Sequence, residues 1–181
     1  MNKNKAWITP KRIAMVLIFI LLVISVLFTR MFTEQSGTES TMESQGIAAY
    51  LQHAVGEHFP VNPKDLFWRQ TANMLVRKAA HFIEYMFVGM FLCAFLNIVT
   101  RRVAVSFVGA ALLSVILAYL DEFRQKFIDG RSPTWLDVRI DSYGAFVGIT
   151  AVTLFFIAYF KIAKLKAEVK RLEAELEQKE A

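Results

Sequence analysis

The sequence predicts an all-α membrane protein: a four-transmembrane-helix bundle with an outer amphipathic helix and a cytoplasmic C-terminal helical tail. Three observations predict this fold class. The 181-residue chain is 55% hydrophobic and only 20% charged, which is too apolar for an ordinary soluble domain of this size. The apolar residues are collected into four runs, each long enough for a helix to cross about 30 Å of hydrocarbon. The charged residues gather near the ends of these runs.

The first apolar run, residues 13–28, contains one polar residue, Ser25. It reaches about twenty positions if Trp7 and Ile8 form its interfacial start. We therefore predict a first transmembrane helix over residues 7–30. A cleaved signal peptide is the alternative, because basic residues precede the run. The segment after the run offers no small-x-small cleavage site, which favours a retained anchor.

Three further apolar runs occupy residues 82–99, 103–120 and 143–160. The first of these is interrupted only near its ends, and the other two contain no charged residue. A backbone in lipid must satisfy its own hydrogen bonds, so these runs are predicted to be helices. Residues 66–160 are therefore predicted to form a three-helix core.

Residues 33–65 are predicted to form an outer linker followed by an amphipathic helix. The linker is rich in Ser, Thr, Glu, Gln and Gly. From Ile47 to Phe59, apolar residues follow the i, i+3, i+4, i+7 spacing of a helix that lies in the membrane interface or covers the mouth of the bundle. Asp65 is suited to cap the helix that continues into the second span.

Residues 161–181 are predicted to form a cytoplasmic, heptad-like helix. Its apolar residues fit a and d positions: Ile162, Leu165, Val169, Leu172 and Leu176. Two copies in one membrane must pair in parallel, which would place like charges opposite each other in Lys161–Lys166, Glu168–Glu173 and Glu175–Glu180. A tail homodimer is therefore disfavoured. The helix is predicted to stand alone, or to contact a different partner or the base of the bundle.

The distribution of Lys and Arg favours a cytoplasmic location for both termini. Four basic residues precede the first span, Arg101 and Arg102 connect the second and third, and several lysines follow the fourth. The bias is small, because this orientation places twelve of the 21 Lys and Arg residues inside and nine outside.

Polar and charged residues gather at the non-cytoplasmic ends of the last three spans. They are Arg77, Lys78, His81, Glu84 and Tyr85 in the second span, Asp121, Glu122 and Gln125 in the third, and Arg131, Asp137 and Asp141 around the start of the fourth. Because the spans cross in alternate directions, these ends meet at one membrane surface. We therefore predict that these side chains share a pocket beneath the outer head groups.

The start of the fourth span has two further features. Ser132 and Pro133 are predicted to be the cap and the first position of its helix. Gly144-x-x-x-Gly148 favours a close approach of this helix to another, which would tighten the cluster.

The mixed composition of the cluster favours a functional site over a purely structural one. Salt bridges and interfacial anchors are the simpler explanation. Holding His81 and Glu84 about one turn below the interface costs on the order of a few kcal/mol for an unpaired charge. Structural pairing rarely requires so many residue types. Such groups could exchange protons, bind an anionic head group or hold a divalent ion.

A metal site has weaker support, although a divalent cation is a possible ligand. His81-x-x-Glu84 has the i, i+3 spacing that carboxylate-bridged sites use. The cluster has one usable His and several competing cations, so no metal ligand and no cofactor are assigned.

The three groups, in this order and spacing, resemble the VanZ-like family of bacterial membrane proteins. The resemblance rests on Arg77-Lys-x-x-His81-Phe-x-Glu84-Tyr85, Asp121-Glu122-x-x-Gln125, and Gly130-Arg131-x5-Asp137-Val-x3-Ser-x-Gly144-Ala-x-x-Gly148. It covers roughly residues 13–160 and implies a multi-pass protein of the bacterial plasma membrane. The founding member is linked to low-level resistance to the glycopeptide teicoplanin, so the resemblance implies a role in antibiotic resistance or envelope homeostasis.

Two features depart from the family pattern. Asp141 stands where many members are expected to have Asn, which makes this site more acidic. The heptad-like tail is not part of the family core.

The first functional hypothesis is a protein that binds an amphiphilic anionic ligand at the outer leaflet. The ligand would be a lipid-linked cell-envelope precursor, a lipid phosphate or a glycopeptide antibiotic. Basic residues would pair with its phosphate or carboxylate. The residues assigned to ligand binding are Arg77, Lys78, Tyr85, Gln125, Arg131, Asp137 and Asp141. Membrane lipids are the other predicted partners, and no nucleic acid is predicted.

Two alternatives remain. A membrane-embedded hydrolase or transferase would use His81 or Glu84 as general base with Asp121 or Glu122 as the acidic partner, and Arg131 would stabilise developing charge. A small proton-coupled transporter would use Glu84 and Asp121 as its protonatable pair. The sequence contains no nucleophilic Ser or Cys motif, phosphate-binding Gly loop or zinc signature, which weakens the enzyme hypothesis.

Overall fold

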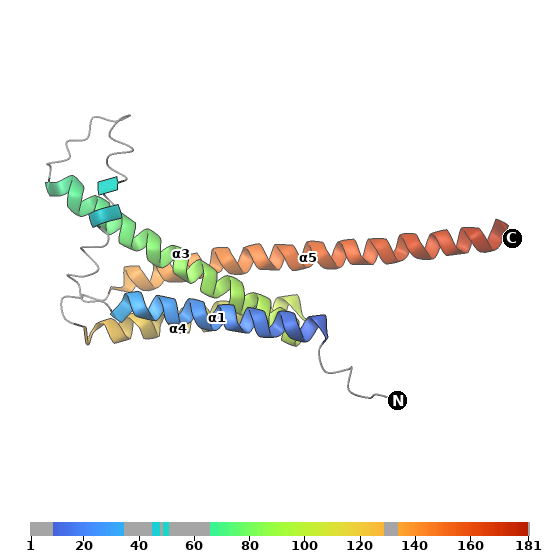
Figure 1. The fold of residues 1–181 in the computed structure, drawn as a ribbon, viewed down its shortest axis with the longest axis horizontal. Helices are drawn as coiled ribbons and strands as arrows, with labels where there is room; N and C mark the ends of the chain where they lie inside the picture. Colours follow the sequence, from blue (N-terminus) through green and yellow to red (C-terminus); the bar gives the residue numbers. More distant parts are fainter. Residues whose placement is uncertain (1–8, 35–44, 48, 51–65, 129–133, 181) are drawn as a thin grey trace.

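The computed structural model describes residues 9–34, 45–47, 49–50, 66–128 and 134–180 of the chain. In this part of the chain, four long helices form: α1 (Pro10–Glu34), α3 (Leu66–Thr100), α4 (Val103–Gln125) and α5 (Trp135–Glu180) (Figure 1). All four are long and apolar enough to cross a membrane. The predicted all-helical fold with four membrane-spanning candidates is therefore confirmed.

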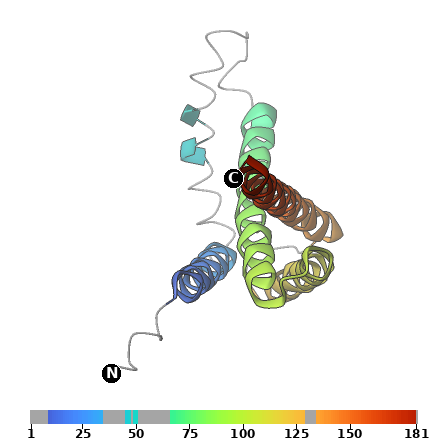
Figure 2. The same cartoon turned by 90° about the vertical axis from the view of Figure 1, so that its right-hand side faces the viewer.

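Successive helices run in opposite directions, so the bundle has two distinct ends (Figure 1). One end carries the beginning of α1 and the short turn between α3 and α4. The other end, which we call the polar end, is formed by the end of α1, the beginning of α3, the end of α4 and the beginning of α5. Figure 2 shows α3 between α1 on one side and α4 and α5 on the other. α3 contacts all three other helices, whereas α1 and α4 meet at few positions.

α3 and α5 form the most extensive helix pair, and glycine residues face the neighbouring backbone where they cross. A Cβ atom added to Gly144 would collide with the backbone of Phe82, and one added to Gly148 with the backbone of Met86. Gly89 meets the backbone of α5 in the same way. Small residues permit such an approach in membranes, where van der Waals packing drives helix association. The predicted close approach through Gly144 and Gly148 is confirmed.

α4 presents one face of small and polar residues to the interior of the bundle. The buried residues are Ser106, Ala110, Ser114, Ala118, Glu122 and Gln125. Intervals of three and four residues place them all on the same side of a helix. The packing of the whole helix therefore turns Glu122 and Gln125 inward at the polar end.

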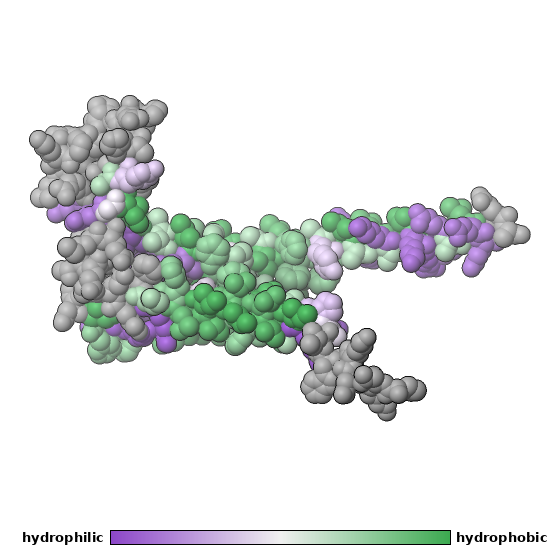
Figure 3. All heavy atoms as spheres, viewed as in Figure 1, coloured by the Kyte–Doolittle hydropathy of each residue, from purple (hydrophilic) through white to green (hydrophobic). Residues whose placement is uncertain are grey.

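α1 lies at the edge of the bundle. Among those of its side chains that the structure describes, Thr29 alone is buried, while Ile13, Ile24 and Phe28 are about half exposed. Figure 3 shows hydrophobic residues along the middle of the bundle and hydrophilic residues at its ends. This distribution fits a bundle whose apolar surface faces acyl chains rather than water.

α5 continues without a break from the bundle into residues 161–180, which project beyond the end that carries the beginning of α1 (Figure 1). The tail is therefore helical, as predicted, and its cytoplasmic location stays a prediction. Of the predicted outer linker and amphipathic helix, residues 45–47 and 49–50 are helical, and nearly all the rest lies outside the described residues.

The predicted start of the last helix is wrong. α5 begins at Trp135, after the non-helical Thr134, so Ser132 is not its cap and Pro133 is not its first position. Thr134 takes the capping role, because its Oγ1 accepts a hydrogen bond from the N–H of Asp137 at 3.3 Å. Ser132 and Pro133 themselves lie outside the described residues.

We expect Gly148→Ala to lower the midpoint of thermal unfolding, measured in detergent by differential scanning fluorimetry. Ala is favoured over Gly in a helix by about 1 kcal/mol, but the collision with the backbone of α3 outweighs this gain and costs about 1–3 kcal/mol. Gly109→Ala is the matched control, since the nearest atom to its added Cβ is Cδ1 of Leu96 at 3.4 Å. The close approach is refuted if Gly148→Ala is as stable as Gly109→Ala.

Candidate functional site

The polar end brings together the side chains that the sequence assigns to a single site. α3 supplies Arg77, Lys78, His81, Glu84 and Tyr85, α4 supplies Asp121, Glu122 and Gln125, and α5 supplies Asp137 and Asp141. Arg131 lies outside the described residues. Four contacts, each between two different helices or their ends, connect these groups, and none of the four involves Arg77.

Lys78 joins α3 to the beginning of α5 through an ion pair. Its Nζ lies 3.0 Å from Oδ1 of Asp137, and about a fifth of each side chain is exposed. The other carboxylate oxygen of Asp137 accepts a hydrogen bond from Oγ1 of Thr134 at 2.8 Å. An acidic residue in the first helical turn also interacts favourably with the helix dipole. The negative charge of Asp137 is thus stabilised from two sides.

Glu122 joins α4 to the residue that precedes α5. Its Oε2 accepts a hydrogen bond from the N–H of Thr134 at 3.1 Å, and its Oε1 accepts one from Nε2 of Gln125 at 3.1 Å. The side chain is almost fully buried. Burying a carboxylate is costly unless hydrogen bonds replace its water. These two bonds therefore hold Glu122 in position and fix the entry of the chain into α5.

His81 lies between two carboxylates in the α3–α5 interface. Its Nδ1 is 3.9 Å from Oε2 of Glu84 and 4.0 Å from Oδ1 of Asp141. The Asp141 side chain is only 2% exposed. These distances suit ion pairing of a protonated imidazole and exceed those of good hydrogen bonds. The arrangement places an acid–base group beside two acids in a region of low dielectric constant.

Tyr85 and Asp121 join α3 to α4. The hydroxyl of Tyr85 donates a hydrogen bond to Oδ2 of Asp121, and the other oxygen of this carboxylate lies 3.7 Å from Nη1 of Arg124. Consecutive helical residues point about 100° apart. Asp121 therefore contacts α3, while Glu122 contacts the start of α5. The sequence did not distinguish these two carboxylates, and the structure gives them different neighbours.

A pocket, which we call the arginine crevice, lies between α1, α3 and α4 beside the Tyr85–Asp121 contact. Two arginine residues line it: the exposed Arg30, near the end of α1, and Arg124, near the end of α4. Its apolar walls are formed by Val26, Val88, Leu117 and Leu120. Its volume is about 60 Å³. The crevice therefore combines cationic groups with apolar walls from all three helices.

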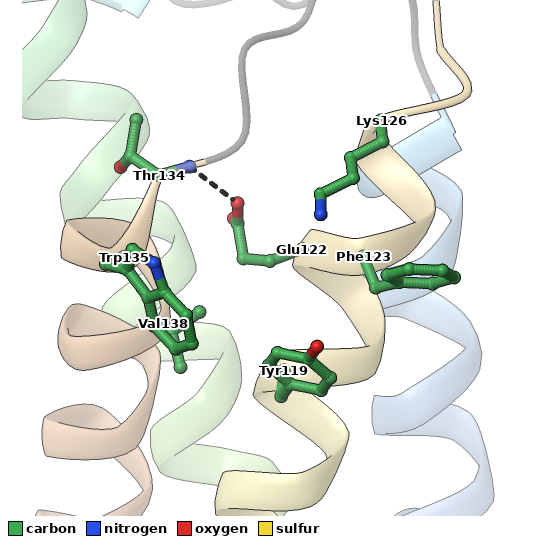
Figure 4. Close-up of a pocket in the computed structure, with 7 residues that line it drawn as sticks. All are labelled: Tyr119, Glu122, Phe123, Lys126, Thr134, Trp135 and Val138. Atoms are coloured by element: carbon green, nitrogen blue, oxygen red, sulfur yellow. Dashed lines mark hydrogen bonds between the residues drawn. The ribbon is translucent and has the colours of Figure 1, made fainter.

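A second pocket, which we call the aromatic pocket, lies between α4 and α5 and has a volume of about 100 Å³. Figure 4 shows Glu122 and Thr134 at one side of it and the rings of Tyr119 and Trp135 along its walls. The two ring centroids are 6.0 Å apart. Lys126 places its Nζ 5.2 Å from the centroid of the Phe123 ring. Apart from the Tyr119 hydroxyl, this pocket is lined by one acidic residue, Glu122, and one basic residue, Lys126.

The described residues contain no group of three or more His, Cys, Asp or Glu side chains that could hold a metal ion. Sequence reasoning missed the two arginines that line the arginine crevice, Arg30 and Arg124. A signal for Arg124 was present, because it follows Asp121 by three residues and so shares its helix face. No comparable signal existed for Arg30, since only the packing of α1 brings it to α4.

The fold and the polar end together define a class: a small multi-pass membrane protein with a polar, charge-rich cluster at one end of its helices. Comparison with family models then identifies the family. The VanZ/LLP1 model matches residues 14–157, and the chain belongs to this family. The match covers most of α1, all of α3 and α4, and α5 up to the base of its projecting part. No curated protein matches the chain, and no solved structure does.

The Lys78–Asp137 contact predicts an asymmetric double-mutant cycle. We expect Lys78→Met to lower the free energy of unfolding by about 1–3 kcal/mol, because it leaves the carboxylate of Asp137 without its cation. Adding Asp137→Asn removes that charge and should recover part of the loss. Reversible unfolding in mixed micelles would measure Lys78→Met, Asp137→Asn and the double variant. Strictly additive effects would show that the two side chains do not interact.

Proposed function

We propose that this protein binds an amphiphilic anionic ligand at the outer leaflet of the bacterial plasma membrane, with the head group in the arginine crevice. The observation that carries the proposal is that Arg30 and Arg124 line one pocket at the polar end together with apolar residues. Lipid phosphates, lipid-linked envelope precursors and glycopeptide antibiotics share the required chemistry. Binding of such a ligand would give the protein its role in envelope homeostasis or antibiotic resistance.

The charges of the crevice favour an anion. Two guanidinium groups and one carboxylate, that of Asp121, are its ionisable groups other than the Tyr85 hydroxyl. If all three are ionised, one positive charge remains, which a monoanionic head group would neutralise. Guanidinium groups match phosphate and carboxylate with paired hydrogen bonds and are more weakly hydrated than ammonium groups. The ligand's negative charge would therefore lie between the ends of α1 and α4.

The walls and the size of the crevice favour a lipid with a compact head group. Leu120 of α4 and Val26 of α1 lie one turn from the two arginines, and Leu117 two turns, on the side toward the middle of the candidate spans. An acyl or prenyl chain would contact these side chains while the head group contacts the arginines. A volume of about 60 Å³ suits a phosphate better than a glycopeptide. Among the three ligand types, the geometry thus favours a lipid phosphate.

A membrane-embedded hydrolase or transferase is the alternative, and one observation favours it. His81 lies within 4.0 Å of carboxylate oxygens of both Glu84 and Asp141. Such a group could take a proton from an attacking water if a substrate reached it. Tyr85 follows Glu84 directly and also lines the arginine crevice, so the two groups of residues are adjacent on α3. Binding and catalysis can be separated by experiment, because the two hypotheses assign them to different residues.

Arg30→Gln provides the test of binding. The full-length protein in phosphatidylcholine nanodiscs would be titrated with dioleoyl phosphatidic acid, and bound lipid would be counted by native mass spectrometry. We expect Arg30→Gln to weaken binding about tenfold, or about 1.4 kcal/mol, because one charge-assisted contact is lost. Arg30 is exposed, so its substitution should leave the fold intact.

Arg102→Gln is the matched control, since Arg102 is also exposed but lies at the opposite end of the bundle. Equal losses in both variants would indicate unspecific charge attraction and contradict the proposal. Unchanged binding in Arg30→Gln would contradict it as well. Release of inorganic phosphate from the bound lipid would favour the hydrolase.

The proposed orientation places both termini in the cytoplasm and the polar end outside. Cysteine labelling in intact cells tests it, in a Cys93→Ser background that removes the buried native thiol. We expect a membrane-impermeant maleimide to label Phe127→Cys, whose parent side chain is 76% exposed at the polar end. Leu176→Cys in the tail should react only after permeabilisation. The reverse pattern would place the ligand site at the inner leaflet.

A further inference from the structure

The projecting part of α5 carries an apolar face that no other described part of the chain covers. Its a and d residues, Ile162, Leu165, Val169, Leu172 and Leu176, are each between 52% and 60% exposed. The spacing of three and four residues places them in one line along the helix. Figure 3 shows hydrophobic residues along this helix, interspersed with hydrophilic ones. Such a face in water is typical of an interaction surface.

The structure argues against the base of the bundle as the surface that covers this apolar face. α5 is one continuous helix from Trp135 to Glu180, and every side chain described from 157 to 179 is exposed. The helix points away from the other three (Figure 1). A shallow groove instead follows its own surface, lined by Ile162, Leu165, Lys166, Val169, Lys170 and Glu173. The face is therefore presented to another molecule.

The charges beside the apolar face argue against a second copy of the chain. Copies in one membrane would pair in parallel, since α5 leaves the bundle in a fixed direction. The g and e positions that flank the core would then bring Lys161 against Lys166 and Glu168 against Glu173. Like charges at these positions oppose pairing, and no opposite pair compensates.

An anionic lipid surface is also a poor partner for the tail. The half of the tail nearest the bundle is basic, with Lys161, Lys164, Lys166 and Lys170. The distal half, residues 171–181, is acidic, with Glu173, Glu175, Glu177 and Glu180 against Arg171 and Lys179. A helix that binds an anionic membrane surface is typically rich in Lys and Arg on its polar face. Here the distal half would be repelled.

We infer that the projecting part of α5 docks a helix of a different protein, whose flanking charges are reversed in order. The partner helix packs apolar residues against Leu165, Val169 and Leu172. It places acidic side chains beside Lys161 and Lys166, and basic side chains beside Glu168 and Glu173. Charge reversal selects this partner over a second copy, and the apolar face supplies the contact area.

A synthetic peptide provides the probe. It has the sequence of residues 161–181 with Lys161→Glu, Lys166→Glu, Glu168→Lys, Glu173→Lys, Glu175→Lys and Glu180→Lys. The unaltered peptide of residues 161–181 is the charge control. Binding of each fluorescent peptide to the full-length protein in phosphatidylcholine nanodiscs would be measured by anisotropy. We expect the reversed peptide to bind roughly tenfold more tightly at low salt, with the difference shrinking at high salt.

Two variants of the protein complete the test. Leu172→Asp should abolish binding of the reversed peptide, whereas Ala174→Asp, on the opposite face, should preserve it. The inference is overturned if both peptides bind equally, or if Leu172→Asp binds like the parent. It is also overturned if a tail-dependent homodimer forms on cross-linking. Loss of peptide binding in nanodiscs that contain phosphatidylglycerol would overturn it too, because the tail would then lie on anionic lipid.

Discussion

Helices in lipid gain little from the hydrophobic effect when they associate, so the architecture depends on how closely their backbones approach. The contact between α3 and α5 supplies this approach. Gly144 and Gly148 place the backbone of α5 directly against that of Phe82 and Met86. Close packing of two long helices collects many small dispersion contacts and fixes their relative register. The register in turn determines which polar side chains meet at the polar end.

The polar end follows from that register. Lys78 lies one turn before Phe82, and Asp137 lies two turns before Gly144, so the glycine contact brings the ion pair together. His81 and Asp141 meet for the same reason. In a medium of low dielectric constant, unpaired polar groups are costly, which explains why Asp137 and Glu122 each accept more than one contact. The network stabilises the bundle and also concentrates acid–base groups at one membrane surface.

The two pockets lie on different sides of α4. The polar end therefore has two separate candidate binding sites. The arginine crevice has an excess of positive charge and apolar walls, whereas the aromatic pocket is lined by one acidic and one basic residue apart from a tyrosine hydroxyl. Tyr85 borders the crevice on one side and neighbours Glu84 in the acidic interior on the other. A ligand in the crevice would therefore lie next to the ionisable groups of the α3–α5 interface, without needing to displace the Lys78–Asp137 pair.

Local chemistry was enough to predict the number of spans, the helical tail, the residues at the polar end and the close approach of Gly144 and Gly148. These follow from run length, periodicity and residue size, which act within a few turns of one helix. Three features could not be predicted from the sequence. They are the different neighbours of Asp121 and Glu122, the capping of α5 by Thr134 instead of Ser132, and the pocket that Arg30 and Arg124 both line. Each of these depends on the rotation and position of one helix relative to another. Packing of side chains distant in sequence sets that geometry, and no local pattern encodes it.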